Sequence, residues 1–544
     1  MVGATGELAG MTTAGVLPAP ATADLKALGR GSSLNFLGAL VSGTAGVATA
    51  VVVARTQSTE ASGVFFVVTS LLLIVSGFTK LGSGLGSVYF VARLRALGRW
   101  DLLPACLRTA TRPVLVVSTV AALALLALAE PLGHLLAADQ AAAVTRALWT
   151  VALLLPFASV LDVVLGASRG LGSMRSTFAI EKCARPLLQL VLVAGACFWA
   201  EDLLALAWTL PWLPAVLLAW PALGKAGQRA SERGRRPGGS RLQPSSAAGA
   251  AEAVEVVPGG GQEWSSRGYW RFCAPRALTA VMQTALLRLD ILLVAGMAGP
   301  REAAVYTAAT RFLVVGQLVN QSVSLAVAPQ LAAVLATRNG AEANVLYRMS
   351  TAWLILAVWP IYLFCALQAP FIMGIFGRNY DDGRPVVVLL SLVMLIAIAC
   401  GLTDVLLNMA GRASWNVYNR GLALGVNVAV DLVLIPRMGI MGAAVGWSAA
   451  ILISNLVPLV QLVRHLQLSP WGSATWRAAL VAGVGCGLVP LVARLVLGSS
   501  APAQVAALGL GLLVYAALTW RWRGLLQLDD LTASVRRRRR PAAI

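Results

Sequence analysis

The chain has 544 residues, of which 58% are hydrophobic and only 12% are charged, and its mean hydropathy is +0.76. Soluble domains carry about 25% charged residues, so this composition excludes a soluble protein and indicates a polytopic membrane protein. The net charge of +20 would favour nucleic-acid binding in a soluble chain. In a membrane protein, arginine-rich cytoplasmic loops and anionic lipid headgroups explain it, so no nucleic-acid partner is expected.

Apolar stretches of about twenty residues, long enough to cross a bilayer core, recur along the whole chain. The expected fold class is therefore an all-α polytopic membrane protein with fourteen transmembrane helices. These spans are predicted at 34–54, 63–83, 112–130, 146–166, 179–199, 203–223, 276–298, 303–327, 349–369, 385–409, 418–436, 439–463, 475–497 and 502–520.

Composition shifts divide the spans into two groups and mark the segments outside them. The region between the sixth and seventh spans is rich in Gly, Ser, Pro, Ala and Arg, which predicts a flexible tether, with a partner-binding segment as the alternative. The expected order is a disordered cytoplasmic tail (1–27), an N-lobe of six helices (28–223), a cytoplasmic linker (224–270), a C-lobe of six helices (271–465), two extra helices (466–520) and a basic cytoplasmic tail (521–544).

Charged residues fall in alternate loops when the N-terminus is placed in the cytoplasm. Arginines dominate the loops assigned to the inside, and most loop acids fall outside, which is the bias that orients membrane proteins. Both termini are therefore expected in the cytoplasm. Inside charges include Arg93, Arg95, Arg99, Arg108, Arg233, Arg235 and Arg236, and outside acids include Glu60, Glu130, Asp139, Asp381 and Asp382.

The two groups of spans also repeat each other in sequence. Gly63-Val64-Phe65 matches Ala304-Val305-Tyr306 at an offset of 241 residues, and Asp162-Val163-Val164-Leu165 matches Asp404-Val405-Leu406-Leu407 at an offset of 242. Matches far apart at nearly one offset indicate a duplicated unit. Because each unit has an even number of spans, the copies share one orientation, and a binding site is expected at their interface near the membrane midplane.

The sequence holds no pattern typical of catalysis, metal binding or cofactor binding. The seven cysteines are scattered without a C-x-x-C pair, and the two histidines, His134 and His465, lie near predicted membrane ends. The longest predicted outer loop, Pro370 to Arg384, is too short for an extracellular catalytic domain. We therefore expect a non-enzyme without a metal or cofactor, although coupling to a proton or sodium gradient stays open.

Three ionisable residues lie within predicted spans of the second unit: Arg288, Asp290 and Arg311. Charges at this depth are costly and are functional hypotheses by default. Arg288 and Asp290 point roughly 200° apart on a helix and cannot pair with each other. One interpretation is an interhelical salt bridge. The other places both arginines in a cavity as contacts for a diphosphate, which the planar guanidinium fork suits, with Asp290 as a cavity or coupling carboxylate.

Three further aspartates lie near predicted helix ends. Asp162 and Asp404 occupy matching positions of the two units, at the inner ends of the fourth and tenth spans. They either cap neighbouring helix ends or form part of an inner gate. Asp431, near the outer end of the eleventh span, is a candidate for an outer gate, with capping again the alternative.

Several short motifs resemble one family. They are Asn35, Gly46 and Ala54-Arg55 followed by Glu60 to Phe65, then Arg288-Leu-Asp290, Glu302 to Tyr306, and Asn427 to Pro436 with Gly439-Ile-Met-Gly-Ala-Ala444. With these motifs, the chain resembles polysaccharide or O-antigen flippases of the multidrug/oligosaccharidyl-lipid/polysaccharide (MOP) exporter superfamily.

The resemblance implies a MATE-like V of two six-helix lobes, and it implies flipping of an undecaprenyl-diphosphate-linked oligosaccharide by alternating access. Glycan polymerase or export proteins and anionic membrane lipids are the partners it implies. A cation-coupled drug exporter of the same fold is an alternative, which an acidic, aromatic-lined cavity would favour. A non-transporting scaffold in envelope synthesis is another, which loss of the cavity charges would favour.

Overall fold

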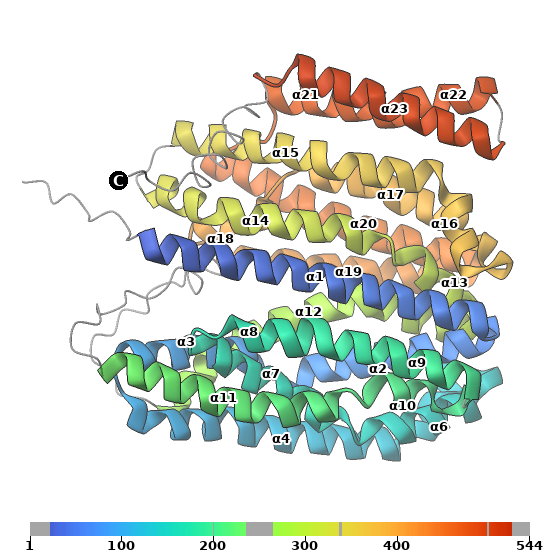
Figure 1. Cartoon of the computed structure of the whole chain (residues 1–544). Helices are drawn as coiled ribbons and strands as arrows, with labels where there is room; N and C mark the ends of the chain where they lie inside the picture. Colours follow the sequence, from blue (N-terminus) through green and yellow to red (C-terminus); the bar gives the residue numbers. More distant parts are fainter. Residues whose placement is uncertain (1–21, 200, 236–264, 337–339, 498–499, 525–544) are drawn as a thin grey trace, which may run out of the picture.

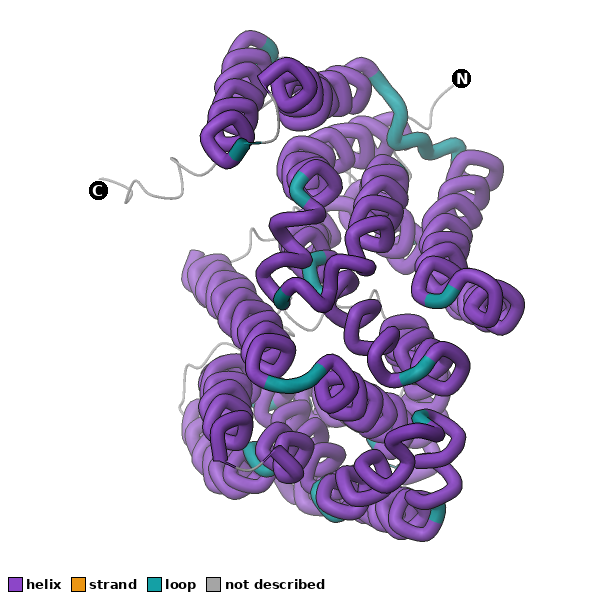
Figure 2. Tube along the Cα trace, turned by 90° about the vertical axis from the view of Figure 1, so that its right-hand side faces the viewer, coloured by secondary structure: helices purple, strands orange, loops and turns teal. Residues whose placement is uncertain are grey.

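The structure is a computed structural model, and it describes residues 22–199, 201–235, 265–336, 340–497 and 500–524. These residues form helices joined by short turns, with no β-strand among them (Figure 2). Twelve described helices are long and apolar enough to cross a membrane, and a thirteenth span would be the pair Ala138–Ala152 and Leu155–Gly170, bent by 43°. The predicted all-α polytopic class is confirmed. The count of fourteen is not established, because the eighth predicted span falls on two shorter helices, Pro300–Thr310 and Leu313–Ala336.

The first half of the chain builds one bundle, the N-lobe, which is the lower group in Figure 1. Its apolar side chains pack into one buried cluster that draws on most of these helices. The helices are α1 (Thr22–Thr56), α2 (Thr59–Thr79), α3 (Ser83–Ala96), α4 (Leu103–Ala127), α5 (Ala129–Leu136), α6 (Ala141–Ala152), α7 (Leu155–Gly170), α8 (Met174–Ser176), α9 (Arg185–Trp199), α10 (Leu204–Thr209) and α11 (Trp212–Arg235). Between them lie the short 3₁₀ turns η1 (Trp100–Leu102), η2 (Ala138–Gln140) and η4 (Glu201–Leu203) and the π-helix η3 (Thr177–Ala184).

The second half builds the C-lobe, and two further spans lie beside it against α15 (Figure 1). The C-lobe helices are α12 (Ser266–Ala298), α13 (Pro300–Thr310), α14 (Leu313–Ala336), α15 (Gly340–Leu367), α16 (Ala369–Phe376), η5 (Arg378–Gly383), α17 (Arg384–Ala399), α18 (Thr403–Met409), α19 (Ala413–Met438), α20 (Ile440–Gln461) and the π-helix η6 (Leu462–Leu466). The extra helices are α21 (Ser473–Ala482), η7 (Gly483–Leu488), α22 (Val489–Leu497) and α23 (Ala501–Arg521).

The two lobes repeat one order of elements, as the sequence matches predicted. In the N-lobe a long helix α4 is followed by the short α5, a 3₁₀ turn η2 and then α6. In the C-lobe the long α15 is followed by the short α16, the 3₁₀ turn η5 and then α17. Irregular elements recurring in the same order are harder to produce by chance than repeated apolar runs, so they support a duplication.

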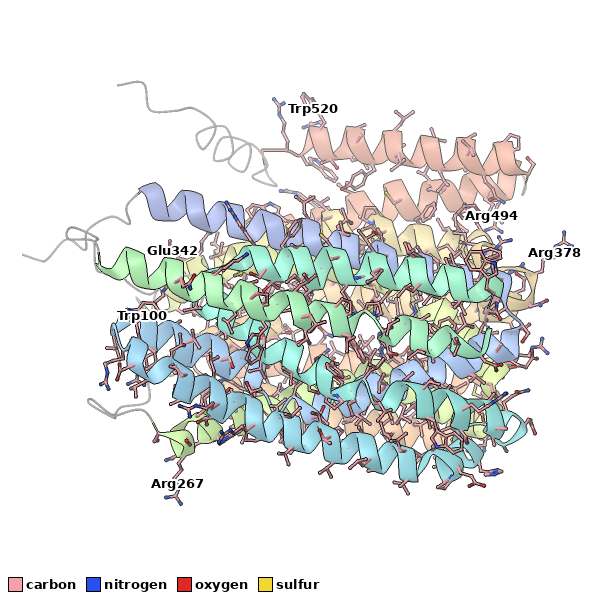
Figure 3. All side chains as sticks on the ribbon, turned by 60° about the horizontal axis from the view of Figure 1, so that its bottom comes forward. Trp100, Arg267, Glu342, Arg378, Arg494 and Trp520 are labelled. Atoms are coloured by element: carbon pink, nitrogen blue, oxygen red, sulfur yellow. The ribbon has the colours of Figure 1, made fainter. Side chains whose placement is uncertain are left out.

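The ends of the bundle differ in what they carry. We name the linker end as the end where α11 stops and α12 starts, and the far end as the opposite one. Figure 3 shows Trp100, Arg267 and Glu342 near the linker end and Arg378 and Arg494 at the far end. Helix α11 continues to Arg235 and α12 begins at Ser266, so helix occupies both margins of the predicted linker. The rest of that linker, the first 21 residues and the Arg536–Arg540 run lie outside the described residues.

The lobes touch each other mainly at the far end. There α2 packs on α13, and Gly63 of α2 lies directly against the backbone carbonyl of Pro300 at the start of α13. The Arg55 guanidinium, at the end of α1, donates to the carbonyl oxygens of Ile375 and Gly374 in α16, each at 2.7 Å. This seam closes the far end, whereas toward the linker end it is α12 that packs on α2 and α3 of the N-lobe.

Helix α12 belongs to both lobes. At its linker end, Tyr269 is fully buried in the N-lobe core, where its hydroxyl donates to the Ser83 carbonyl at 3.2 Å, and Phe272 stacks on Tyr89 at 4.5 Å. Further along, the Trp447 indole of α20 donates to the Leu286 carbonyl at 3.2 Å. The helix therefore contacts both lobes, and it stays packed on the N-lobe near its end, where Gly296 lies against the Leu135 carbonyl of α5. The residues near its middle lie between the lobes.

Candidate functional site

A cluster of polar side chains is buried where α12, α13 and α19 meet. Asp290 and Asp431 are 3% and 0% exposed. The Tyr306 hydroxyl donates to Asp290 Oδ2 at 2.9 Å, and Asn427 Nδ2 donates to Asp431 Oδ2 at 3.1 Å. The two carboxyl groups are themselves within interaction distance of each other. Two aspartates, an asparagine and a tyrosine thus form one contact network across three helices.

Three oxygen atoms of this network have no hydrogen-bond donor. They are Oδ1 of Asp290, Oδ1 of Asp431 and Oδ1 of Asn427, all buried. An unsatisfied buried acceptor costs about 1–3 kcal/mol, and two adjacent buried carboxylates repel each other as well. A sodium ion or a shared proton fits such an oxygen-only set and would offset the repulsion with positive charge. Of the residues the structure describes, no three His, Cys, Asp or Glu gather as ligands for another metal.

Arg288 lies near enough to Arg311 for its charge to act on the Arg311 guanidinium. Both are half-buried, and Arg311 Nε is buried without an acceptor. The Arg311 guanidinium lies over the Phe66 ring of α2, 5.6 Å from its centre. In the described part of the chain neither arginine has a carboxylate within ion-pair distance. The salt-bridge interpretation of Arg288 therefore finds no partner, since Asp290 bonds to Tyr306 and faces Asp431.

The two arginines lie at the same depth. By the helical rise of about 1.5 Å per residue, Arg288 is roughly 15 Å from the end of α12 at Ala298. Arg311 follows directly after α13, which begins at Pro300 and ends at Thr310, so it is roughly 16 Å from the same end. Half of a bilayer core is about 15 Å. By this measure both arginines lie near mid-depth, and neither has a described counter-charge.

The break between α13 and α14 sets the position of Arg311. Helix α13 ends at Thr310 and α14 begins at Leu313, and the Arg311 N–H bonds to the Ala308 carbonyl in a tighter turn. A continuous helix was expected over 303–327. The interruption turns the chain at the depth of Arg288, beside Phe66 of the other lobe.

The remaining candidate aspartates lie within their own lobes. Asp404 forms an ion pair with Arg420 of α19 at 3.2 Å, and its backbone carbonyl accepts from Asn416 at 3.0 Å. Asp162 of α7 faces Gly84 of α3, whose missing side chain leaves room for the carboxylate. These neighbours are the ones expected of helix-end bonding, and the inner-gate role stays a prediction. Asp431 contacts Asp290, so its neighbours are those of the oxygen cluster.

Sequence reasoning did not single out Asn427, Tyr306 or Phe66 as site residues. One signal could have found Asn427: it precedes Asp431 by one helical turn, so the two side chains share a face of α19. Asn427 served only as part of a family motif. Tyr306 matches Phe65 at the repeat offset, so Phe66 lies one residue past the matching position, and nothing local distinguishes Tyr306 or Phe66 from core aromatic residues.

The fold and site together define a class. Two pseudo-symmetric helical lobes with charged side chains between them are an arrangement also found in membrane proteins built from internal repeats.

Comparisons with known proteins agree with this class. Residues 263–385 match the family model described as "Polysaccharide biosynthesis protein". No curated protein matches the sequence. Among solved structures, lipid II flippase MurJ in an inward closed conformation has a TM-score of 0.68 at 12% identity, covering 91% of this chain and 99% of that one.

Other similar structures come from the same superfamily. An inward-facing multidrug resistance MATE transporter has a TM-score of 0.56 at 12% identity, covering 78% of this chain and 94% of that one. A MOP superfamily transporter from Pyrococcus furiosus has a TM-score of 0.51 at 14% identity, covering 82% and 96%. At such identities the likeness establishes the fold. The predicted resemblance to the MOP exporter superfamily is confirmed at that level.

Proposed function

We propose that the chain is a flippase that moves a lipid-linked oligosaccharide, carried on undecaprenyl diphosphate, across the bacterial cytoplasmic membrane. One observation carries the proposal: Arg288 and Arg311 lie at a similar depth, within electrostatic reach of each other, and neither has a described carboxylate partner. Each guanidinium can donate two parallel hydrogen bonds to a phosphate, so two of them match a diphosphate. The family match over 263–385 supports a glycan as the rest of the cargo.

The charge of the site separates this proposal from a drug exporter. Moving a diphosphate through the membrane core requires opposite charge at the midplane, because an unpaired charge there is costly. Arg288 and Arg311 supply that charge. A cavity for cationic drugs would instead need free carboxylates, and the nearby Asp290 and Asp431 face each other and Tyr306. The linker end would then face the cytoplasm, with both termini on that side and the far end outside.

Binding of the lipid carrier tests the arginines directly. The purified full-length chain is titrated with undecaprenyl diphosphate, and Arg288→Ala, Arg311→Ala and Arg288→Lys are compared with Arg378→Ala, an exposed arginine at the far end (Figure 3). A hydrogen bond to a charged group contributes about 1.5–3 kcal/mol, so each cavity alanine should weaken binding roughly 10- to 150-fold. Lysine keeps the positive charge but lacks the planar guanidinium group, so Arg288→Lys should weaken binding less than Arg288→Ala.

Stability measurements separate a binding arginine from a structural one. Removing a partner from a buried ion pair costs about 3–5 kcal/mol, whereas an arginine without a partner leaves nothing uncompensated. We therefore expect both alanine variants to keep their membrane abundance and melting temperature while losing surface glycan in a deletion strain. Unchanged binding and export in both would remove the basis of the diphosphate site and favour a scaffold.

We also propose that the cluster of Asp290, Asn427 and Asp431 binds the coupling cation, a proton or sodium. Its three unsatisfied oxygens support this role. A ligand that binds only the folded state stabilises it by about 2.7 kcal/mol at a hundred times its Kd. Sodium should thus raise the melting temperature of the wild-type chain but not of Asp290→Asn or Asp431→Asn. If sodium has no effect and acidification stabilises only the wild type, the cation is the proton; the absence of both effects contradicts a cation site.

A further inference from the structure

A second pocket lies away from the lobe interface, at the linker end of the C-lobe. It has a volume of about 290 Å³ and is lined by Trp415 and Tyr418 of α19 and by Gln461 and His465 from the end of α20 and the following π-helix. Known ligand pockets begin at about 300 Å³, so this one suits a small group. In the described part of the chain, these four residues make no hydrogen bond, ion pair or ring contact with the cluster or the arginines described above.

The backbone around the pocket is irregular in two ways. Residues Leu462–Leu466 form a π-helix, and Gln467 has a φ of 53°, one of two non-glycine residues at positive φ in the described chain. π-Turns inside helices and residues in strained conformations gather at functional sites. Here the π-helix brings the His465 ring edge-on to the Trp415 ring, with the ring centres 5.1 Å apart.

The pocket residue Gln461 is held to the neighbouring helix by hydrogen bonds. Gln461 and Asn419 exchange two hydrogen bonds between α20 and α19, at 2.8 and 2.9 Å. Asn419 is buried, and both side-chain amide groups are occupied by this exchange. The pair fixes the spacing of the two helices beneath the aromatic side chains. It also leaves little of the Gln461 amide for a ligand.

Two arginines without a described counter-charge lie close to the pocket residues, one in space and one in the chain. The Arg412 guanidinium lies over the Trp415 ring, 4.3 Å from its centre, and Arg464 is the neighbour of His465 in the π-helix. Neither arginine has an ion-pair partner in the described chain, whereas nearby Arg420 is paired with Asp404. Two arginines without a described counter-charge, close to an aromatic wall, favour an anionic group.

An apolar surface continues from the pocket toward the far end. Tyr418 is 67% exposed, and exposed aliphatic side chains follow it along α19 and α20. Such a stripe is typical of a lipid-facing surface, and Trp and Tyr at its end are typical of the membrane–water boundary. These aliphatic residues are Leu422, Leu432, Val433, Leu456, Val460 and Val463.

We propose that this pocket binds the phosphate headgroup of an anionic membrane phospholipid, whose acyl chains lie along the stripe. Basic pockets between transmembrane helices on the cytoplasmic side are suited to anionic headgroups. Arg412 and Arg464 would hold the phosphate, Trp415 would hold Arg412 in place, and His465 would close the side. This site is separate from the proposed substrate site, and binding there does not depend on flipping.

Bound lipid can be counted on the full-length chain. The protein is released from nanodiscs containing equal amounts of phosphatidylglycerol and phosphatidylcholine, and retained lipids are measured by native mass spectrometry. Phosphatidylglycerol should be retained selectively. A basic residue near the membrane surface strengthens the binding of an anionic lipid about fivefold, so Arg412→Ala should weaken phosphatidylglycerol retention by about that factor. The matched control is Arg437→Ala, an exposed arginine at the far end of the same helix.

A second measurement locates the site without relying on a variant that folds. A photoactivatable phosphatidylglycerol should crosslink to peptides containing Trp415 or His465, and unlabelled phosphatidylglycerol should compete. Equal loss in Arg412→Ala and Arg437→Ala would mean attraction to general surface charge and would overturn the proposal. Equal retention of phosphatidylcholine, crosslinks confined to other helices, or competition by N-acetylglucosamine but not phosphatidylglycerol would overturn it as well, the last in favour of a sugar site.

Discussion

The seam between the lobes at the far end should depend on the missing side chain of Gly63. A Cβ atom at this position would overlap the backbone carbonyl oxygen of Pro300, well inside the 3.0 Å that real Cβ atoms keep from other heavy atoms. The carbonyl belongs to the first turn of α13 and cannot rotate away as a side chain could. Gly63→Ala must therefore move α2 and α13 apart.

The free-energy cost of Gly63→Ala follows from the kind of contact that the substitution disturbs. Forcing one additional methyl group into a packed interface costs about 1–3 kcal/mol. If the far end opens and closes during transport, the penalty falls on the closed state alone. The equilibrium should then shift toward the open far end by about 5- to 150-fold. Gly46→Ala is the matched control, because a Cβ there meets no atom within 4 Å.

Labelling measures this shift. In a cysteine-free background, a cysteine replaces Ser62, which is fully buried at the seam. An impermeant thiol reagent should label it slowly in the otherwise unchanged chain and in Gly46→Ala, and much faster in Gly63→Ala. Equal labelling rates and equal melting temperatures in the two alanine variants would refute the close packing of α2 on α13.

Other changes test neighbouring parts of the structure. Arg55→Ala removes two hydrogen bonds to backbone carbonyls, which contribute about 1–2 kcal/mol at an exposed position, so it should speed labelling at the seam. Arg55→Lys should speed labelling less. Unchanged labelling would mean that these hydrogen bonds do not hold the far end closed. Asp162→Asn and Asp404→Asn should leave the labelling of cavity cysteines unchanged if these residues only bond within their lobes, whereas a shift toward an inward-open cavity would support the gate. A cysteine at Asp382, exposed at the far end, should be labelled in intact cells and one at Ser414, exposed at the linker end, should not; the reverse would invert the assigned orientation.

Charge and hydropathy patterns were sufficient to predict most of the fold. Uninterrupted apolar runs predict spans because a bilayer accepts little else, and the repeat offset predicts two lobes. The patterns failed where packing overrides them. The expected helix over 303–327 breaks at Arg311, and the predicted linker is helical at both margins because α11 and α12 extend past their apolar residues. Neither a polar break at mid-depth nor a helical extension beyond the membrane has a signature in hydropathy.

The candidate site was only partly predictable for a geometric reason. A costly charge in an apolar run identifies Arg288, Asp290 and Arg311 without any knowledge of neighbours. Whether Asp290 pairs with an arginine or with Asp431 depends on how α12 rotates against α19, and that is set by the packing of whole helices. The sequence assigns Asp431 to a helix but not to a face of that helix. It therefore predicts a gate residue and does not predict the contact with Asp290.

The position of α12 has a consequence for motion. Its first turns are anchored in one lobe through Tyr269, and its later turns are held to the other through Leu286 and Asp290. A straight, rigid rod fixed in both bodies would hold them at one angle. If the lobes rock, the rod itself has to flex between Tyr269 and Leu286, and Pro275, which cannot donate a helical hydrogen bond, lies in that interval. Arg288 lies just beyond this interval, so the same flexing that opens the molecule would swing its guanidinium relative to the N-lobe.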